Sequence, residues 1–546
     1  MSPFCRPRFN PKERRARDAF PTALAILRAE IPNPTPHVKH IPLLFLLLSA
    51  LVFSGKAQIS LPQNTDTVPR PIKVTTTGTA EIGGKKIAYR AETGRMEISG
   101  PDRKPMALMG YTAYTLDGKK SGPGRPVIFA FNGGPGSSSI WLHMGALGPK
   151  RVRVNDPHPT PNAPYTLEDN KRSLIDMADV VMIDPVGTGI STAAGEKKEK
   201  DFWGVDEDIE SISAFIRRYL LEKGLMNAPK YLLGESYGTF RSAGIMDYMQ
   251  GKGIAFNGVI MVSAVFDLLT LTFSAGSDLS YPMFLPTYAA TAHYHEKLID
   301  RPDDLDAFLD EVRAFTETVY IPALYKGTRL AQSEKEKIAD RLALYTGLSA
   351  NFWFRADLRV KAGEFFAELL RDEGETVGRL DSRYRGMSQD LMSRTGEYDP
   401  FTTSLGLPYT AAFLDYYHRT LKADPTVEYH TSAYGKEGFK WNWEHKGNKS
   451  WGTVTSITTA PDMARTLTRN PHTKVLILNG LYDLGTPFYA VEYTLDHMGL
   501  KPEIRDNIYM KYYPSGHMMY TDEESFDAFE RDVREFIRQT ANIFGE

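Results

Sequence analysis

The feature that most constrains this chain is residues 230–246, which read KYLLGESYGTFRSAGIM. An apolar run up to Leu233 predicts a buried strand, and helix-compatible residues follow Gly238. A strand, a tight G-x-S-x-G turn and a helix form the pattern of a nucleophile elbow, which raises Ser236 above the edge of a sheet. Glycine is expected two residues before and two residues after Ser236, because the turn holds the serine backbone in a strained conformation in which nearby Cβ atoms would clash. The alternative is a chance occurrence of a short pattern.

The rest of the chain contains further predicted strands, which would form a sheet with this one, and helices that would connect them. Alternating residues on either side of Gly83-Gly84 predict a hairpin within residues 73–116. Amphipathic helices are expected at residues 205–223 and 523–543. Further strands are expected at residues 125–131, 180–183, 257–266, 474–478 and 508–513. Strands that alternate with helices predict an α/β sheet with parallel crossovers.

The alternation stops in residues 268–451, which are rich in helical and aromatic patterns. Charged amphipathic stretches at residues 304–318 and 362–373 are typical of helices. We therefore expect one α/β domain, formed by residues 72–267 and 452–546, that carries a largely helical cap insertion at residues 268–451.

The first 57 residues predict export. Residues 41–53 form an apolar run of thirteen residues, with Lys39 before it and Ser54-Gly55-Lys56-Ala57 after it. These features are typical of a signal peptide, so residues 1–57 are expected to be removed on export to the periplasm or the exterior. A transmembrane anchor is the alternative, but the run is shorter than the ~20 residues that cross a bilayer. Residues 58–71 are expected to form a flexible lead-in.

The stretch before the apolar run is unusual for a signal peptide. Residues 1–36 are rich in arginine and proline, and we expect translation to begin near Val38, so that residues 1–37 are not made. The removed region contains Cys5, the only cysteine. The mature protein is therefore expected to lack a disulfide, a thiolate metal site, a cysteine nucleophile and a lipid-anchored cysteine.

Composition excludes other classes of function. The formal net charge is −2 and 24% of the residues are charged, as in an ordinary globular protein. No basic run alternates with aromatic residues, so no nucleic-acid partner is expected. Residues 441–445, WNWEH, lack the ligand spacing of a metal site, and no metal or other cofactor is expected.

Two late residues follow predicted strands in the order that a serine nucleophile requires. Asp483 comes just after the strand at 474–478, and His517 just after the strand at 508–513. A serine needs a histidine base and a carboxylate that fixes the base's tautomer, and α/β-hydrolase folds present them in this order. We therefore predict an α/β-hydrolase fold with Ser236, Asp483 and His517 as catalytic residues. The alternative for His517 is a solvated loop histidine.

Residues 131–139, FNGGPGSSS, follow an early strand and predict part of an oxyanion hole. Such a hole needs two backbone N–H groups aimed at the developing negative charge. One is expected from Tyr237, the residue after the nucleophile, and the other from this loop. An ordinary Gly-Pro turn is the alternative, whereas a phosphate loop would need a Gly-Lys-Ser/Thr ending that is absent here.

The motifs NGGPGSSS, DPVGTGIS, GESYG, NGLYDLGTP and SGHM, in this order, resemble those of the serine carboxypeptidases, peptidase family S10, in an exported bacterial form. The resemblance runs through the predicted catalytic domain. It implies that the enzyme removes C-terminal residues from peptides and proteins through an acyl-enzyme, usually best at acid pH. It also implies that the amides of Gly134 and Tyr237 form the oxyanion hole. Asn132, the Gly133 amide and Glu235 would bind the free carboxylate of the substrate.

Glu235 has a chemical reason to favour binding at low pH. An ionised Glu235 would repel the substrate carboxylate, whereas a protonated one would donate a hydrogen bond to it. The alternative is a solvent-facing residue of the turn. The chain departs from the family pattern at Ala146, where many members have glutamate, at Ser137, where many have cysteine, and at Leu481, where relatives have an acid. Of these, Ala146 bears on how the carboxylate is recognised.

Other functions remain open on the sequence alone. An esterase or acyltransferase would use the same scaffold, because an acyl-enzyme can pass its acyl group to different acceptors. A binding module without catalysis is the third alternative. We expect the insertion to supply a specificity pocket, although aromatic residues in a cap are more often part of its core. The candidate residues are Tyr281, Phe284, Tyr288, Trp353, Trp441 and Trp443.

Overall fold

The computed structural model describes residues 70–445, 449–450, 453–454 and 457–542. Contacts divide the chain into two units, residues 1–66 and 67–546, and everything below concerns the second unit. The predicted signal peptide and translation start, in residues 1–57, lie outside the described residues, as does most of the predicted lead-in. Among the described residues, no helix is long and apolar enough to cross a membrane.

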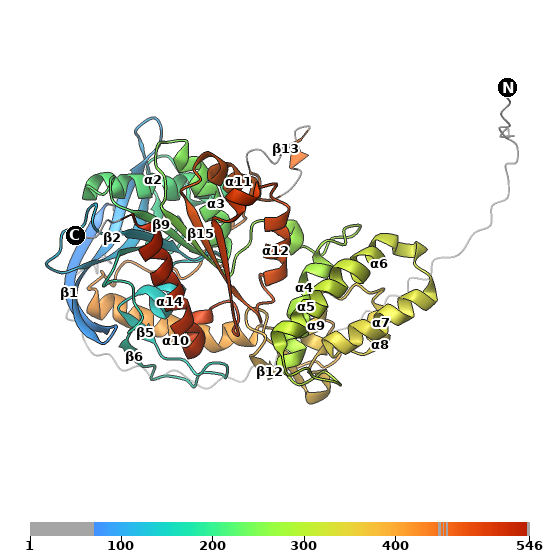
Figure 1. The fold of residues 1–546 in the computed structure, drawn as a ribbon. Coiled ribbons are helices and arrows are strands. Elements are labelled where there is room, and N and C mark those ends of the chain that lie inside the picture. Colours follow the sequence, from blue (N-terminus) through green and yellow to red (C-terminus); the bar gives the residue numbers. More distant parts are fainter. Residues whose placement is uncertain (1–69, 446–448, 451–452, 455–456, 543–546) are drawn as a thin grey trace, which may run out of the picture. The chain divides into compact units, whose positions relative to one another are not determined.

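One twisted sheet organises this unit (Figure 1). Its strands, in spatial order, are β1 (Ile72–Ile82), β2 (Lys85–Ser99), β3 (Pro105–Leu116), β7 (Asp179–Ile183), β4 (Val127–Phe131), β9 (Lys230–Glu235), β10 (Gly258–Val262), β15 (Lys474–Gly480) and β16 (Ile508–Tyr513). The short β8 (Thr192–Ala193) pairs with β3. Strands β1 to β3 are antiparallel, and β3 also pairs antiparallel with β7. Strands β7, β4, β9, β10, β15 and β16 are parallel, so their carboxyl ends meet at one edge.

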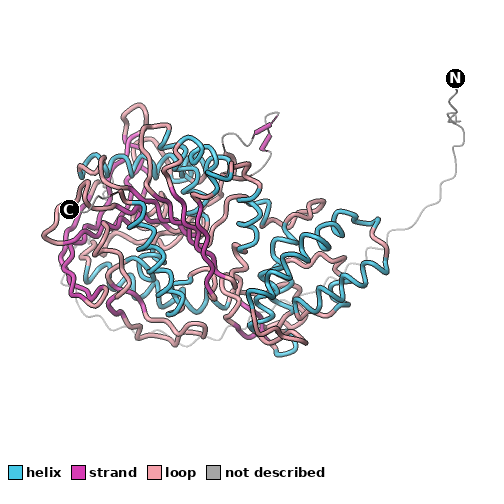
Figure 2. The backbone as a smooth tube through the Cα atoms, in the orientation of Figure 1, coloured by secondary structure: helices cyan, strands magenta, loops and turns pink. Residues whose placement is uncertain are grey.

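The central parallel strands β7, β4, β9 and β10 are almost wholly buried because helices cover both faces of the sheet (Figure 2), whereas the edge strand β16 is partly exposed. In β4, Ile128 and Ala130 face one core, whereas Val127 and Phe129 face the other. Apolar residues of α1 (Ile140–Leu142), α10 (Pro400–Asp415) and α14 (Glu523–Thr540) pack in the first core. Apolar residues of α2 (Val205–Lys223), α3 (Tyr237–Gln250) and α11 (Ala460–Arg469) pack in the second.

Most helices between β10 and β15 form a separate group beside α12 (Phe488–Asp496) (Figure 1). They are α4 (Ser280–Tyr294), α5 (Leu305–Phe315), α6 (Ile321–Lys326), α7 (Gln332–Thr346), α8 (Ala350–Arg355) and α9 (Ala362–Glu368). They share a third hydrophobic core, in which Tyr288 stacks on Phe365 with ring centroids 4.1 Å apart. Helix α10 belongs to the same stretch of chain but packs against the sheet instead.

Short elements complete the structure. They are β5 (Lys150–Val152) with β6 (Leu167–Asp169), β11 (Glu375–Val377) with β12 (Arg385–Met387), β13 (Lys449–Ser450) with β14 (Thr453–Val454), and α13 (Pro502–Arg505). The predicted hairpin turn at Gly83-Gly84 joins β1 to β2, and α2 has the predicted bounds. Helix α9 is shorter than the predicted helix at 362–373, because residues after Glu368 form a turn that leads into β11.

This topology confirms the predicted α/β-hydrolase fold with a largely helical insertion. The cap boundaries at residues 268 and 451 stay predictions.

Candidate active site

Ser236 lies in the sharp turn between β9 and α3. Its backbone has φ 60° and ψ −130°, a conformation that residues with a side chain rarely adopt. A Cβ on Gly234 would lie 2.3 Å from the carbonyl oxygen of Gly238, and a Cβ on Gly238 would lie 2.9 Å from the carbonyl oxygen of Phe131. The predicted elbow is therefore present, and both glycines are needed for the close approach of its backbone.

The glycine loop after β4 packs directly against this turn. A Cβ on Gly133 would lie 2.4 Å from the amide nitrogen of Tyr237, so only glycine fits there. Tyr237 is the first residue of α3, and its amide therefore has no acceptor within the helix. Gly134 follows in a left-handed conformation with φ 109°. The two predicted oxyanion donors, the amides of Gly134 and Tyr237, thus belong to segments in direct contact.

Asp483 and His517 form a buried pair at the ends of β15 and β16. His517 Nδ1 lies 2.6 Å from Asp483 Oδ2, so Nδ1 carries a proton toward the carboxylate and, in the neutral imidazole, Nε2 is the acceptor. The other carboxylate oxygen, Oδ1, accepts the amides of Gly485 and Thr486 at 2.8 and 3.0 Å. Burial lowers the pKa of His517, but the charge and hydrogen bond of Asp483 outweigh it, and the pKa lies above its ordinary value.

A cavity of about 260 Å³ gathers six of the eight predicted site residues. They are Asn132, Gly133, Gly134, Glu235, Ser236 and His517. Asp483 lies behind His517, and the Tyr237 side chain points away and packs edge-on against Trp441 and Trp443. Within the described part of the chain, no hydrogen bond joins the Ser236 hydroxyl to His517. Such catalytic hydrogen bonds commonly form only when substrate is bound.

Glu235 is buried beside Ser236 and is 3% exposed. Its Oε1 accepts a hydrogen bond from Asn132 Nδ2 at 2.7 Å, and its Oε2 accepts one from the Tyr520 hydroxyl at 2.6 Å. Burial raises the pKa of Glu235 to about 7, although His517 and these two hydrogen bonds act in the opposite direction. A carboxyl group that is half protonated near neutral pH therefore lines the cavity.

Tyr520 is a site residue that sequence reasoning missed. Its ring passes close to Gly145, where a Cβ would lie 2.3 Å from ring atom Cε2. Ala146, next to Gly145 in the chain, is buried and offers no carboxyl group, and the Tyr520 hydroxyl donates a hydrogen bond to Glu235 Oε2. Only the folded structure brings Tyr520, which follows the histidine loop, to the residue before Ser236.

Arg241, in α3, holds the glycine loop that begins at Asn132 through a buried hydrogen bond. This guanidinium is 0% exposed, and its Nη1 donates to the carbonyl oxygen of Asn132 at 2.7 Å. Its Nε donates to Asp208 at 2.6 Å, which keeps the buried charge paired. The Asn132 side chain is held as well, since its Oδ1 accepts the Leu142 amide at 3.0 Å.

A segment of the insertion, residues 379–384, holds the loops that carry Asp483 and His517. The His517 amide donates to the carbonyl oxygen of Leu380 at 2.7 Å, and the Ser382 amide donates to the carbonyl oxygen of Tyr482 at 2.9 Å. Asp381 Oδ2 accepts the Gly516 amide at 3.1 Å. The segment therefore fixes the chain on either side of the Asp483 and His517 pair.

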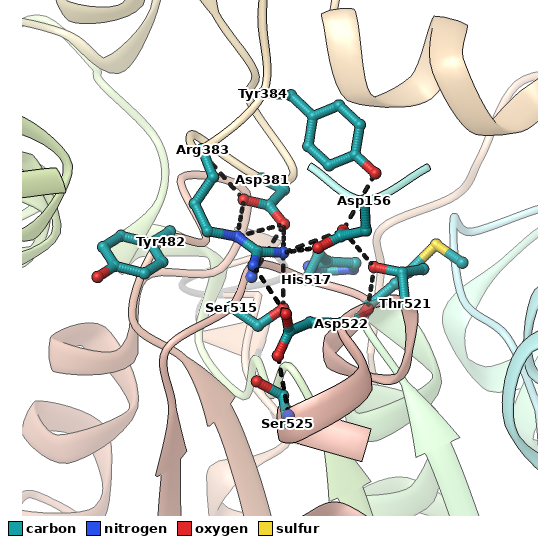
Figure 3. Close-up of polar contacts among 12 residues, drawn as sticks. Asp156, Asp381, Arg383, Tyr384, Tyr482, Ser515, His517, Thr521, Asp522 and Ser525 are labelled. Carbon is teal, nitrogen blue, oxygen red and sulfur yellow. Dashed lines mark hydrogen bonds and ion pairs between the residues drawn. The ribbon is translucent and has the colours of Figure 1, made fainter. Parts of the chain in front are cut away.

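Arg383 binds this segment to its surroundings (Figure 3). Its Nη2 lies 2.6 Å from Asp381, 3.0 Å from Asp156 and 3.0 Å from the Ser515 hydroxyl. Figure 3 shows Arg383 and the two carboxylates gathered close to His517. This cluster could not be predicted from the sequence, because Asp156 and Ser515 are far along the chain from Asp381 and Arg383.

None of the six aromatic candidates for the specificity pocket lines the cavity, and four of them take the alternative position in a hydrophobic core. Tyr281, Phe284, Tyr288 and Trp353 lie in the core of the insertion, because aromatic residues at helical spacing pack between helices. Trp441 and Trp443 pack against Tyr237. The remaining cavity lining, which sequence reasoning missed, consists of Ser137, Trp141, Arg379, Leu380, Phe401, Thr402, Leu405, Tyr434, Gly485, Thr486 and Met518.

The described residues contain no group of three or more His, Cys, Asp or Glu side chains placed to hold a metal ion.

Comparison with known proteins finds one family model that matches part of the chain. Residues 113–268 match the family model Peptidase_S10, serine carboxypeptidase. The matched part contains the glycine loop and the elbow but not Asp483 or His517. A comparison with curated proteins finds no match.

Solved structures with a similar fold are distant in sequence. Kex1(delta)p of Saccharomyces cerevisiae, a prohormone-processing carboxypeptidase, has 14% identity and a TM-score of 0.48, over 82% of this chain and 91% of that one. Proline iminopeptidase of Mycobacterium smegmatis has 14% identity and a TM-score of 0.33, over 82% and 98%. A putative aryl esterase of Burkholderia cenocepacia has 11% identity and a TM-score of 0.32, over the same shares.

Proposed function

We propose that this chain, whose residues 113–268 match the serine carboxypeptidase family model, is a serine carboxypeptidase that removes single residues from the C-termini of peptides through an acyl-enzyme on Ser236. One observation carries the proposal. A single cavity is lined by a serine on a strained elbow, by an imidazole that Asp483 orients, and by the protonatable carboxyl group of Glu235. The first two groups suit acyl transfer, and the third suits recognition of a free carboxylate.

In the first half of the reaction, Ser236 Oγ attacks the carbonyl carbon of the last peptide bond. His517 Nε2 accepts the hydroxyl proton, and Asp483 stabilises the imidazolium that forms. The amides of Gly134 and Tyr237 donate to the oxyanion of the tetrahedral intermediate. His517 then gives the proton to the leaving nitrogen as the carbon–nitrogen bond breaks, and the last residue departs as a free amino acid.

In the second half, water attacks the acyl-enzyme and His517 accepts its proton. The tetrahedral intermediate collapses, the ester bond to Ser236 breaks, and the serine recovers its proton from His517. The shortened peptide leaves with a new free carboxylate.

Glu235, Asn132 and the amide of Gly133 select substrates that end in a free acid. Glu235 donates a hydrogen bond to the substrate carboxylate when it is protonated, and Asn132 retains a second amide hydrogen beyond the one given to Glu235. The carboxylate fixes the last residue, so the nucleophile reaches only the bond before it.

A pair of peptides tests this function. One peptide has a free C-terminus and its twin is amidated, and mass spectrometry follows the products with wild type and with Ser236→Ala. We expect removal of the last residue only from the free acid and only by wild type. Cleavage of esters without trimming of either peptide would instead indicate an esterase or acyltransferase. Trimming of the acid peptide by Ser236→Ala would contradict the assigned nucleophile.

We also propose that the enzyme works outside the cytoplasm, on the basis of the signal-peptide pattern in residues 1–57. N-terminal sequencing of the protein from its native cells should give Gln58 as the first residue. A mature protein that retains Met1 to Pro36 would contradict both export and the translation start near Val38.

A further inference from the structure

We propose that Arg379, which lines the cavity beside His517, makes the enzyme prefer substrates whose last residue has an acidic side chain, aspartate or glutamate. This inference rests on the proposed function and names the substrates that the same site selects.

The cavity fixes where the last side chain of a substrate must lie. Asn132, Gly133 and Glu235 occupy the part that takes the terminal carboxylate, and Ser236 attacks the bond just before the last residue. With about 260 Å³ of space, the side chain of that residue meets the rest of the lining. The large side chains there belong to Trp141, Arg379, Leu380, Phe401, Leu405, Tyr434 and Met518.

Arg379 is the one lysine or arginine among the described residues of this lining. Its guanidinium forms no hydrogen bond or ion pair with any other described side chain, and the residue is exposed. The charged and titratable groups around it are Glu235, His517, Tyr434, Asp399 and Asp483. The Asp483 carboxylate is taken up by His517 and by the amides of Gly485 and Thr486. Asp399 uses its carboxylate to accept backbone amides, including that of Arg379 at 2.9 Å, and not the guanidinium.

The backbone of Arg379 is fixed on both sides, so its side chain starts from a defined point. Its amide donates to Asp399, and its carbonyl oxygen accepts the Leu484 amide at 3.0 Å. Its Nη1 lies 3.3 Å from the position that a Cβ on Gly485 would take, which places the guanidinium beside the loop that carries Asp483.

A guanidinium that forms no ion pair with another described side chain suits a substrate carboxylate better than any other substrate side chain. Its planar donors bind both oxygens of a carboxylate at once, and such charge-assisted pairs are about twice as strong as neutral hydrogen bonds. A substrate that ends in lysine would be repelled by Arg379. A substrate that ends in glutamine would offer the guanidinium only a neutral acceptor. Glutamate and glutamine have the same shape, so the difference between them isolates the charge.

Four blocked dipeptides that differ only in the last residue test the inference. The last residue is Glu, Gln, Leu or Lys, and kcat/KM is measured at pH 6, where the glutamate side chain is ionised. For wild type we expect a preference for Glu over Gln of about tenfold, as for a hydrogen bond to a charged group. In Arg379→Gln this ratio should fall to about one, and in Arg379→Glu it should invert, with the Lys peptide gaining most. Arg217→Gln, an exposed arginine on α2, is the matched control and should keep the wild-type ratio.

Each outcome decides one question. A wild-type enzyme that releases all four residues with a Glu to Gln ratio near one would overturn this inference and leave the proposed function intact. An equal loss on all four peptides in Arg379→Gln would also overturn it, because Arg379 would then bind the terminal carboxylate. A wild type that releases no residue from any peptide would overturn the proposed function, and this inference with it.

Discussion

Replacement of Glu235 by glutamine should remove the pH dependence of substrate binding. Burial raises the pKa of Glu235 to about 7, so the side chain is mostly protonated at pH 6 and mostly ionised at pH 8. The substrate carboxylate, with an ordinary pKa of ~3.5, stays ionised over this range. Protonated Glu235 donates a hydrogen bond to it, whereas ionised Glu235 repels it. Binding should therefore weaken as pH rises.

The magnitude follows from the protonated fraction. That fraction falls from about 90% at pH 6 to about 10% at pH 8, so KM for a free-acid peptide should rise by about ninefold, close to 1.3 kcal/mol. In Glu235→Gln, KM should stay constant over the same range. KM must be measured separately from kcat, because His517 must be neutral to act as the base and its titration changes kcat.

Two tyrosine variants test whether the titration of Glu235 causes the pH dependence of KM. The Tyr520 hydroxyl donates to Glu235 and stabilises its ionised form, so Tyr520→Phe should raise the pKa further and move the rise in KM to higher pH by about one unit. Tyr409→Phe is the matched control, since this buried tyrosine also borders Gly145 but donates no hydrogen bond to Glu235 in the described structure. A KM for Glu235→Gln that rises in parallel with wild type above pH 7 would refute the reasoning.

Two further variants test the structure around the site by chemical denaturation. Arg383→Met leaves Asp381 and Asp156 buried without their cation, and the free energy of unfolding should fall by about 3–5 kcal/mol; a loss below about 1 kcal/mol would contradict the assigned ion pairs. Gly145→Ala forces a Cβ against the Tyr520 ring, and we expect a loss of about 1–3 kcal/mol together with a higher KM for free-acid peptides. Gly406→Ala, in α10 with open space around it, is its control and should be neutral or stabilising; equal losses for the two variants would show that the ring contact is not the cause.

The parts of the fold that follow from local pattern could be predicted from the sequence. The apolar run before Gly234 and the helix-compatible run after Gly238 predicted β9 and α3, and the amphipathic spacing of residues 205–223 predicted α2 with its observed bounds. The α/β-hydrolase fold followed because strands and helices alternate, and the order of Ser236, Asp483 and His517 agreed with it. The catalytic roles of these three residues stay predictions.

The support of the site could not be predicted, because it consists of contacts between distant segments. Tyr520 meets Glu235, and Arg241 meets Asn132, only after the sheet has formed. The segment 379–384 looked like part of a helical insertion, yet it fixes the loops of both Asp483 and His517. The aromatic candidates failed for a related reason, since a residue such as Trp353 has the same appearance in a sequence whether it lines a pocket or fills a core.

The central claim is that Ser236 is the nucleophile of a carboxypeptidase, and covalent labelling tests it most directly. Wild type is treated with one equivalent of a fluorophosphonate, and intact mass, peptide mapping and removal of the last residue from a free-acid peptide are measured on the same sample. We expect a single adduct on Ser236, loss of peptidase activity in proportion to labelling, and no adduct on Ser236→Ala. An adduct on another residue, or full peptidase activity in completely labelled enzyme, would contradict the account.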